Sequence, residues 1–287
     1  KYSRKRISLD FLDINEDTIK INKNEIEGIL IDNLEDFNDY KISKLLFLRN
    51  SGIKIITLEN LCENYLQRFP PEILKKEYLI KGNFNIPQKS FQSRIKRIGD
   101  VLLSILLLII TSPIILISCI LIFLEDRKFF IYKQQRVGIS QNIFTIYKLR
   151  TMKINSESGK PVWATKYDKR ITKIGRILRK YRIDELPQLI CVIRGDMSLI
   201  GPRPEREEID KKLSEIIPHY NTRYLIRPGL SGWAQVNYPY GASVDDTRKK
   251  LSYDLFYLRN FSTWLDFLIL LKTIRLVLLK KGAIPNK

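Results

Sequence analysis

Two adjacent carboxylates, Asp184 and Glu185, stand in a segment that is otherwise rich in Lys and Arg, RIDELPQL at 182–189. One interpretation is a helix start, since the free N–H groups of a first turn and the helix dipole favour negative charge. The other is chemical. A carboxylate among cations has its ionised form favoured, which lowers its pKa and keeps it available as a nucleophile or metal ligand. Spacing alone leaves both interpretations open.

Three clusters of Pro and Gly follow the acidic pair, GPRP at 201–204, RPG at 227–229 and SGWAQV at 231–236. Arg203 lies between two prolines, so a stiff backbone presents its guanidinium, which suits bidentate binding of a phosphate or carboxylate. A structural turn with an exposed arginine is the alternative. Two neighbouring carboxylates could recruit Mg²⁺, which neutralises phosphate charge. Together these features favour phosphoryl transfer.

The basic character of the chain is confined to one part of it. The 287 residues carry a formal charge of +19, yet residues 1–90 hold 15 basic and 14 acidic side chains, against 35 and 17 in residues 91–287. The second part should therefore face an anionic partner: nucleic acid, an anionic membrane surface or phosphorylated substrates. Three distant cysteines and a single histidine favour neither a disulfide framework nor a zinc site, and they fit a reducing, cytosol-facing location.

An uncharged apolar segment occupies residues 101–124. As a continuous helix it would reach roughly 36 Å, enough to span a bilayer. Ser112-Pro113 falls at its midpoint, where proline removes a backbone hydrogen bond, so we expect a break there, with the Ser112 hydroxyl bonding a freed backbone group. Both flanks are basic, and the positive-inside rule places such charge on the cytoplasmic side. These features favour a re-entrant helix over a spanning one, without excluding spanning.

The remaining elements are predicted from periodicity. Residues 28–61 read as one β-α-β unit whose helix ends at Gly52, and residues 129–152 as two strands joined at 139–142. The unit lacks a glycine-rich phosphate loop, so no nucleotide site is assigned to it. Residues 170–183 form a basic amphipathic helix that lies either on an anionic membrane or on the core. The apolar helix at 264–281 leaves the same alternatives.

The motifs of the basic part resemble those of the bacterial sugar transferases, the monotopic polyprenyl-phosphate phosphoglycosyl transferase family. The matching runs are KRIGDVLLS, TSP, YKQQRVG, IFTIYKLRTM, DKRITKIGRILRKYRIDELPQLICVIRGDMSLIGPRPE and RPGLSGWAQVN, which cover about residues 91–280. Residues 28–80 resemble, more weakly, the tail of the Rossmann-like domain that precedes the transferase in larger members. Those members usually carry transmembrane helices further upstream, so we expect this chain, which begins at Lys1, to be a piece of a longer protein.

This resemblance implies a membrane-associated α/β (α+β) fold in three parts. A partial Rossmann-like regulatory domain and linker occupies residues 1–90, a re-entrant membrane helix 91–126, and a cytosolic phosphoglycosyl transferase domain 127–287. The implied location is the bacterial inner membrane, with the catalytic domain on the cytosolic face and anionic lipid beside it. A homo-oligomer is left open.

The resemblance also implies an activity. Such enzymes move a sugar-1-phosphate from a UDP-sugar to undecaprenyl phosphate and release UMP, as the first membrane step of exopolysaccharide, capsule or O-antigen synthesis. Asp184 would attack the β-phosphate and form a covalent intermediate, with Mg²⁺ at Asp184 and the diphosphate and Glu185 as an outer ligand or base. The remaining substrate-binding candidates are Lys148, Arg150, Arg203, Arg227 and, in the SGWAQVN run, Gln235.

This sequence departs from the family pattern at Leu149, Cys191 and Trp233, which concern packing more than chemistry, although Trp233 could alter the nucleotide or sugar pocket. Two other functions stay open. A membrane-associated binding protein without catalysis would use Asp184 and Glu185 only as helix-terminal charges, and a glycosyl transferase that moves the sugar alone would release UDP. Nucleic-acid binding is not expected, because it has no use for residues 101–124.

Overall fold

The computed structural model describes residues 28–32, 37–74, 84, 90–154, 168–239, 241 and 243–279. By its internal contacts the chain forms two compact units, Lys1–Leu66 and Gln67–Lys287. The division falls before the domain boundary predicted at residue 90, and the long apolar helix belongs to the second unit.

The first unit contains the predicted β-α-β arrangement. Strands β1 (Ile29–Ile31) and β2 (Ile55–Thr57) pair in parallel, and α1 (Asp39–Asn50) connects them. The connection turns at Gly52, whose φ of 92° is the left-handed conformation that favours glycine after a helix. The short α2 (Leu58–Leu61) and a π-helical turn (Cys62–Leu66) end the unit. The two-strand arrangement confirms the β-α-β prediction, while its kinship with a Rossmann-like domain stays a prediction.

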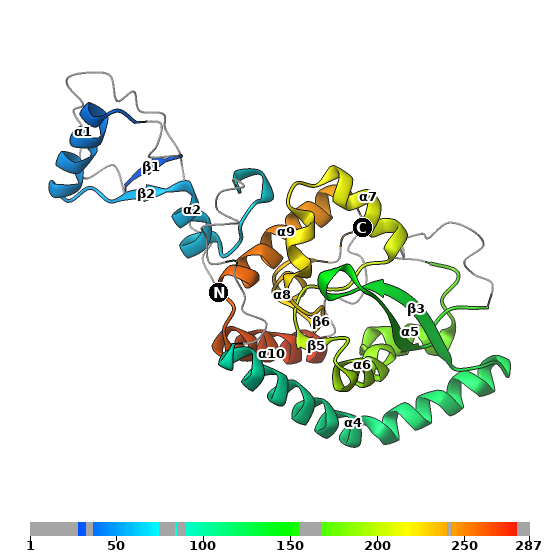
Figure 1. Ribbon diagram of the computed structural model, residues 1–287. Helices are drawn as coiled ribbons and strands as arrows, with labels where there is room; N and C mark the ends of the chain where they lie inside the picture. Colours follow the sequence, from blue (N-terminus) through cyan, green and yellow to red (C-terminus); the bar gives the residue numbers. More distant parts are fainter. Residues whose placement is uncertain are drawn as a thin grey trace. The chain divides into compact units, whose positions relative to one another are not determined.

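The long apolar segment is one helix, α4 (Phe91–Asp126), and it is the one helix in the described residues that is long and apolar enough to cross a membrane. It continues through Pro113, so the predicted complete break is wrong; Figure 1 shows instead that the helix changes direction near its middle. The Ser112 hydroxyl donates to the Ile109 carbonyl at 2.8 Å, which is the group that Pro113 leaves without an N–H partner. This bond, which the sequence analysis predicted in kind, lets the helix bend without an unsatisfied carbonyl.

One side of α4 packs against the rest of the second unit, and the other side is exposed. Leu103, Leu107 and Leu108 pack against the main core, and Ile122 is buried against Leu149 and Leu178. Twelve large apolar side chains of α4 remain exposed between residues 102 and 124: Leu102, Ile105, Leu106, Ile109, Ile110, Ile114, Leu116, Ile117, Ile120, Leu121, Phe123 and Leu124. So large an apolar surface is typical of contact with lipid or another protein.

The rest of the second unit is a mixed fold with small sheets. The predicted hairpin is confirmed as the antiparallel pair β3 (Ile131–Val137) and β4 (Ile143–Leu149), joined by a short turn, and β5 (Ser198–Ile200) pairs in parallel with β6 (Gly229–Ser231). The helices are α5 (Lys173–Lys180), α6 (Leu189–Arg194), α7 (Glu207–Ile216), α8 (Trp233–Asn237), α9 (Val244–Arg259) and α10 (Thr263–Leu278). Among the described residues, the 3-10 helices are η3 (Pro71–Ile73), η4 (Ile139–Gln141) in the turn of the hairpin, η5 (Ile183–Gln188) and η6 (Tyr220–Leu225).

Two helices with exposed apolar faces accompany α4. The predicted basic amphipathic helix is α5, which begins at its Thr172 cap; Leu178 is buried, whereas Ile177 is 55% exposed. On α10, Leu265 and Ile269 are buried, while the opposite side exposes Trp264, Phe267, Leu271, Ile274 and Leu278. Each helix therefore packs on the core along one side and leaves apolar residues for an interface on the other.

Candidate active site

A reversal of the chain presents the two carboxylates. Helix α5 ends at Lys180, and Arg182 then adopts a left-handed conformation with φ 55° and ψ 24°. A non-glycine residue in this region is uncommon and is characteristic of functional turns. The next residue starts η5, which places Asp184 and Glu185 in its first turn. The helix-start interpretation of this pair is therefore confirmed.

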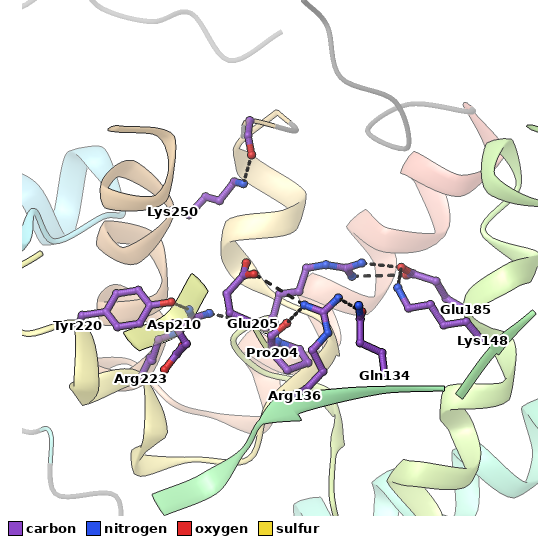
Figure 2. Close-up of polar contacts among 12 residues, drawn as sticks. Gln134, Arg136, Lys148, Glu185, Pro204, Glu205, Asp210, Tyr220, Arg223 and Lys250 are labelled. Atoms are coloured by element: carbon purple, nitrogen blue, oxygen red, sulfur yellow. Dashed lines mark hydrogen bonds and ion pairs between the residues drawn. The ribbon is translucent and has the colours of Figure 1, made fainter. Parts of the chain in front are cut away.

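Glu185 is the centre of a cluster of cations. Its Oε1 accepts a hydrogen bond from Lys148 Nζ at 3.1 Å and from Arg203 Nη2 at 2.5 Å, while Arg182 Nη1 lies 3.6 Å from Oε2. Figure 2 shows the side chains of Lys148 and Glu185 next to each other, with a dashed line between them. Two segments distant in the sequence, at Lys148 and Arg203, thus supply positive charge to one buried carboxylate, and Arg182 adds to it from the adjoining turn.

Asp184 lies beside this cluster without joining it. Its side chain is 8% exposed, and within the described residues no hydrogen bond or ion pair reaches its carboxylate. Burial, together with the neighbouring charge of Glu185, raises the pKa of Asp184 to about 6. The prediction that surrounding cations lower this pKa is wrong for Asp184, because burial and the Glu185 charge outweigh the opposing effect of Lys148, Arg179 and Arg182.

The cations act on Glu185 instead. Arg203, Lys148 and Arg182 overcome the effect of burial and hold the pKa of Glu185 well below its ordinary value. Burial lowers the pKa of the Lys148 ammonium, and Glu185 opposes that shift. The site therefore contains one carboxylate, Glu185, whose ionised form is favoured by three cations, and one largely buried carboxylate, Asp184, that forms no hydrogen bond or ion pair within the described residues.

Two of the arginines predicted to bind phosphate make other contacts. Arg150 is buried and forms a bidentate pair with Asp126, both N–O distances being 2.5 Å, which ties the end of α4 to β4. Arg227 is exposed and donates through Nε to the Gly195 carbonyl at 2.9 Å, at the C-terminal end of α6. Neither contacts Asp184 or Glu185 in the described structure, whereas Lys148 and Arg203 do meet at Glu185.

The SGWAQVN run lies against α9 and α10. Trp233 is 3% exposed, stacks on Phe256 and donates its indole N–H to the Gln67 carbonyl at 2.9 Å, so it is a core residue here and does not line an open pocket. Gln235 donates its amide to the Leu230 carbonyl at 3.1 Å, and its Oε1 is buried without a partner among the described residues. In the described part of the chain no hydrogen bond or ion pair joins Gln235 to the acidic pair, and its substrate contact stays a prediction.

Two cations near the acidic pair were not predicted. Arg182 has only its position three residues before Glu185 as a signal, and its left-handed backbone could not be foreseen. Arg179 donates to the Thr151 hydroxyl at 2.8 Å and contributes, after Lys148, to lowering the pKa of Asp184. In the basic helix, both looked like solvated charges.

A divalent cation would find few protein ligands at this site. In the described residues no group of three His, Cys, Asp or Glu side chains could hold a metal ion. Magnesium, however, is commonly bound through one or two carboxylates plus substrate phosphates. The unpaired, buried carboxylate of Asp184 fits that ligand set, while the oxygens of Glu185 already accept from cations. The residues present therefore fit a magnesium ion that arrives with a diphosphate.

The sequence of the second unit matches a known family. The family model described as bacterial sugar transferase covers residues 91–280. The chain belongs to the bacterial sugar transferase family. The match includes α4, the acidic pair and the Arg203 turn, and so contains every element of the candidate site.

The chain is similar to several sugar-phosphate transferases of this family. The chain is 47% identical over 189 residues to the UDP-N-acetylgalactosamine-undecaprenyl-phosphate N-acetylgalactosaminephosphotransferase of Aeromonas hydrophila, covering 66% of this chain and 45% of that protein. It is 40% identical over 190 residues to the UDP-glucose:undecaprenyl-phosphate glucose-1-phosphate transferase of Caulobacter vibrioides, covering 66% and 71%. The Escherichia coli K12 protein of the same description is 32% identical over 202 residues, covering 70% and 44%. The chain thus spans less than half of the Aeromonas and Escherichia relatives.

Proposed function

We propose that this chain transfers a sugar-1-phosphate from a UDP-sugar to undecaprenyl phosphate and releases UMP. The observation that carries the proposal is the difference between the two acids. Asp184 is buried and forms no ion pair in the described structure, whereas the adjacent Glu185 pairs with Lys148 and Arg203. A phosphate drawn to those cations arrives next to a nucleophile that has little solvation to lose. The names of the Aeromonas and Caulobacter relatives supply the donor and acceptor classes.

The proposed chemistry has two displacements at the same phosphorus. A carboxylate oxygen of Asp184 attacks the β-phosphorus of the UDP-sugar, the bond from that phosphorus to the bridging oxygen breaks, and UMP leaves with the electron pair. An oxygen of undecaprenyl phosphate then attacks the phosphoglycosyl-aspartate, and the Asp184 carboxylate is released as the lipid diphosphate-linked sugar forms. Lys148 and Arg203 stabilise negative charge on the phosphate oxygens. When bound, Mg²⁺ would neutralise diphosphate charge, with Asp184 as its protein ligand.

The arrangement of α4 supports a site at the surface of a membrane. Near its start, Arg97 donates to the Val192 and Ile193 carbonyls, and Asp100 accepts from Ser198 at 2.6 Å. At its other end Glu125 accepts from the Lys173 backbone N–H at 2.9 Å. Because one folded unit holds both ends of the helix, both ends lie on the same side of a bilayer in our proposal, and the bend at Pro113 dips into it. The proposed location is the cytosolic face of the bacterial inner membrane, with anionic lipid beside the basic helices.

The test is a donor panel that distinguishes nucleotide products. The protein in detergent is incubated with Mg²⁺, undecaprenyl phosphate and either UDP-N-acetylgalactosamine or UDP-glucose, and UMP and UDP are separated by chromatography. We expect UMP and a lipid-linked diphosphate sugar from at least one donor. UDP as the nucleotide product would support a glycosyl transferase instead, and no turnover of any UDP-sugar would support a binding protein.

The matched variant is Asp184→Asn, which keeps the size of the side chain and removes the nucleophile. It should bind the UDP-sugar, yet form no adduct of sugar phosphate with the protein on intact-mass analysis, and release no UMP. Wild-type turnover by this variant would exclude Asp184 as the nucleophile.

A further inference from the structure

The turn that carries Arg203 is held by its carbonyl groups. Four consecutive carbonyls accept hydrogen bonds from four different donors: Pro202 from the Gly229 N–H, Arg203 from Arg223 Nη2, Pro204 from Arg136 Nη1, and Glu205 from the Val137 N–H. The distances lie between 2.5 and 3.0 Å. Proline has no N–H, so a Pro-Arg-Pro segment has few donors of its own with which to build a turn. Its conformation is therefore imposed from outside.

Arg223 supplies one of these bonds from a fully buried position. Its side chain is 7% exposed, donates to the Tyr220 hydroxyl at 2.6 Å and lies 3.5 Å from Asp254 on α9. The third contact of the same guanidinium is the Arg203 carbonyl at 2.5 Å. The planar, forked guanidinium can reach three acceptors at once, which a lysine ammonium on the same stem cannot do with this geometry.

Arg136 supplies the neighbouring bond from strand β3. Its Nη1 donates to the Pro204 carbonyl at 3.0 Å, and Nη2 donates to Gln134 Oε1 at 2.6 Å. Figure 2 shows Arg136 between Gln134, Pro204 and Glu205, with Arg223 on the other side of the same turn. Arg223 and Arg136, from separate elements, thus donate hydrogen bonds to the adjacent carbonyls of Arg203 and Pro204, and the Arg203 side chain pairs with Glu185.

We infer that Arg223 and Arg136 are positioning residues for Arg203: they fix the backbone of the Pro-Arg-Pro turn so that its guanidinium stays at the phosphate-binding end of the site. Neither touches Asp184 or Glu185 in the described structure, so both act through Arg203. This inference rests on the proposed function for its role in catalysis. A misplacement of about 1 Å in such a group can cost about a hundredfold in rate.

The test is a double-mutant cycle between Arg223→Lys and Arg203→Ala. Lysine keeps the charge that faces Asp254 and loses the fork. Alone, Arg223→Lys should lower kcat/KM for UMP release by roughly 10- to 100-fold. In the Arg203→Ala background the same change should cost less than about twofold, because the group it positions is already gone. Equal losses in both backgrounds, or no loss in either, would overturn the inference.

A matched control and a second readout complete the experiment. Arg248→Lys on the same helix as Asp254 makes the same chemical change at a half-exposed pair with Glu72, and should leave kcat/KM within about twofold in both backgrounds. Arg136→Lys is run through the same cycle, so that the inference remains testable if Arg223→Lys does not fold.

The second readout needs no activity. In thermal unfolding, Arg203→Ala should lower the midpoint less than half as much in the Arg223→Lys background as in the wild type. The reason is that Arg223→Lys already weakens the ion pair between Arg203 and Glu185. Equal shifts would contradict positioning. If the wild-type protein releases no UMP, the proposed function fails, and the unfolding cycle still decides whether Arg223 positions Arg203.

Discussion

Asp184 and Glu185 are neighbours in the chain with opposite electrostatic environments. The cations raise the ionisation tendency of Glu185, whereas burial and the Glu185 charge disfavour ionisation of Asp184. A carboxylate that is largely removed from water and forms no ion pair destabilises the folded protein when it is ionised. A diphosphate with its magnesium would supply the missing partner in our proposal. The two acids are therefore not interchangeable.

This asymmetry predicts opposite effects of neutralising the two acids on stability. Because the folded protein raises the pKa of Asp184 from 3.8 to about 6, ionisation of this group lowers the free energy of unfolding as the pH rises between these two values, and the full loss of at most about 3 kcal/mol is present above them. Asp184→Asn should therefore raise the unfolding midpoint at pH 7 in EDTA, and the gain should disappear as the pH falls towards 4. Glu185→Gln should lower the midpoint at pH 7. Equal effects of both variants across this pH range would contradict the assignment, as measured by thermal unfolding in detergent.

At the scale of elements, hydrogen bonds and ion pairs attach the ends of α4 to the folded unit. Asp126 at its C-terminal end pairs with Arg150, and Lys96 near its start lies 2.7 Å from Asp266 on α10. Lys96 also lies 3.8 Å from Asp100, which is four residues further along the same helix. These contacts convert a long apolar helix into part of the unit that bears the site.

The Arg150 pair predicts a structural effect for a residue that the family resemblance assigned to phosphate. Arg150→Met should lower the unfolding midpoint, because it leaves Asp126 unpaired and frees the end of α4, while the KM for the UDP-sugar stays within about twofold. Lys148→Met, two residues away, should reduce kcat/KM by at least about tenfold, because it removes a cation from Glu185. A tenfold rise in KM for Arg150→Met with an unchanged midpoint would instead place Arg150 on the donor.

At the scale of the whole second unit, α4, α5 and α10 each combine a packed side with exposed apolar residues. The unit supplies both polar contacts at the ends of α4 and the cations of the site. Because both ends of α4 are held by the same folded unit, both ends must lie on the side of the bilayer where that unit lies. The geometry therefore favours a helix that enters and leaves through one face.

This geometry predicts a single-sided labelling pattern. In a variant whose Cys62, Cys119 and Cys191 are replaced by serine, single cysteines at Gln92 and Lys128, both exposed, should react with a membrane-impermeant maleimide in inverted membrane vesicles and not in intact spheroplasts. Reaction of the two positions from opposite sides would show that α4 spans the membrane. A cysteine at the exposed Lys211 on α7 reports the side of the folded unit in the same experiment.

The sequence by itself determined the family, the β-α-β unit, the β3–β4 hairpin, helices α4, α5 and α10, and the acidic pair, because these depend on local periodicity and on motifs that lie within a few residues. It also predicted the hydroxyl bond of Ser112 at the proline. Only the tertiary structure decided which arginines serve the site. Arg150 and Arg203 were both candidates for binding phosphate, yet Arg150 pairs with Asp126 and Arg203 with Glu185. The pKa difference between adjacent acids likewise depends on burial and on the charges of Lys148 and Arg203, which come from distant segments, and no local pattern contains that information.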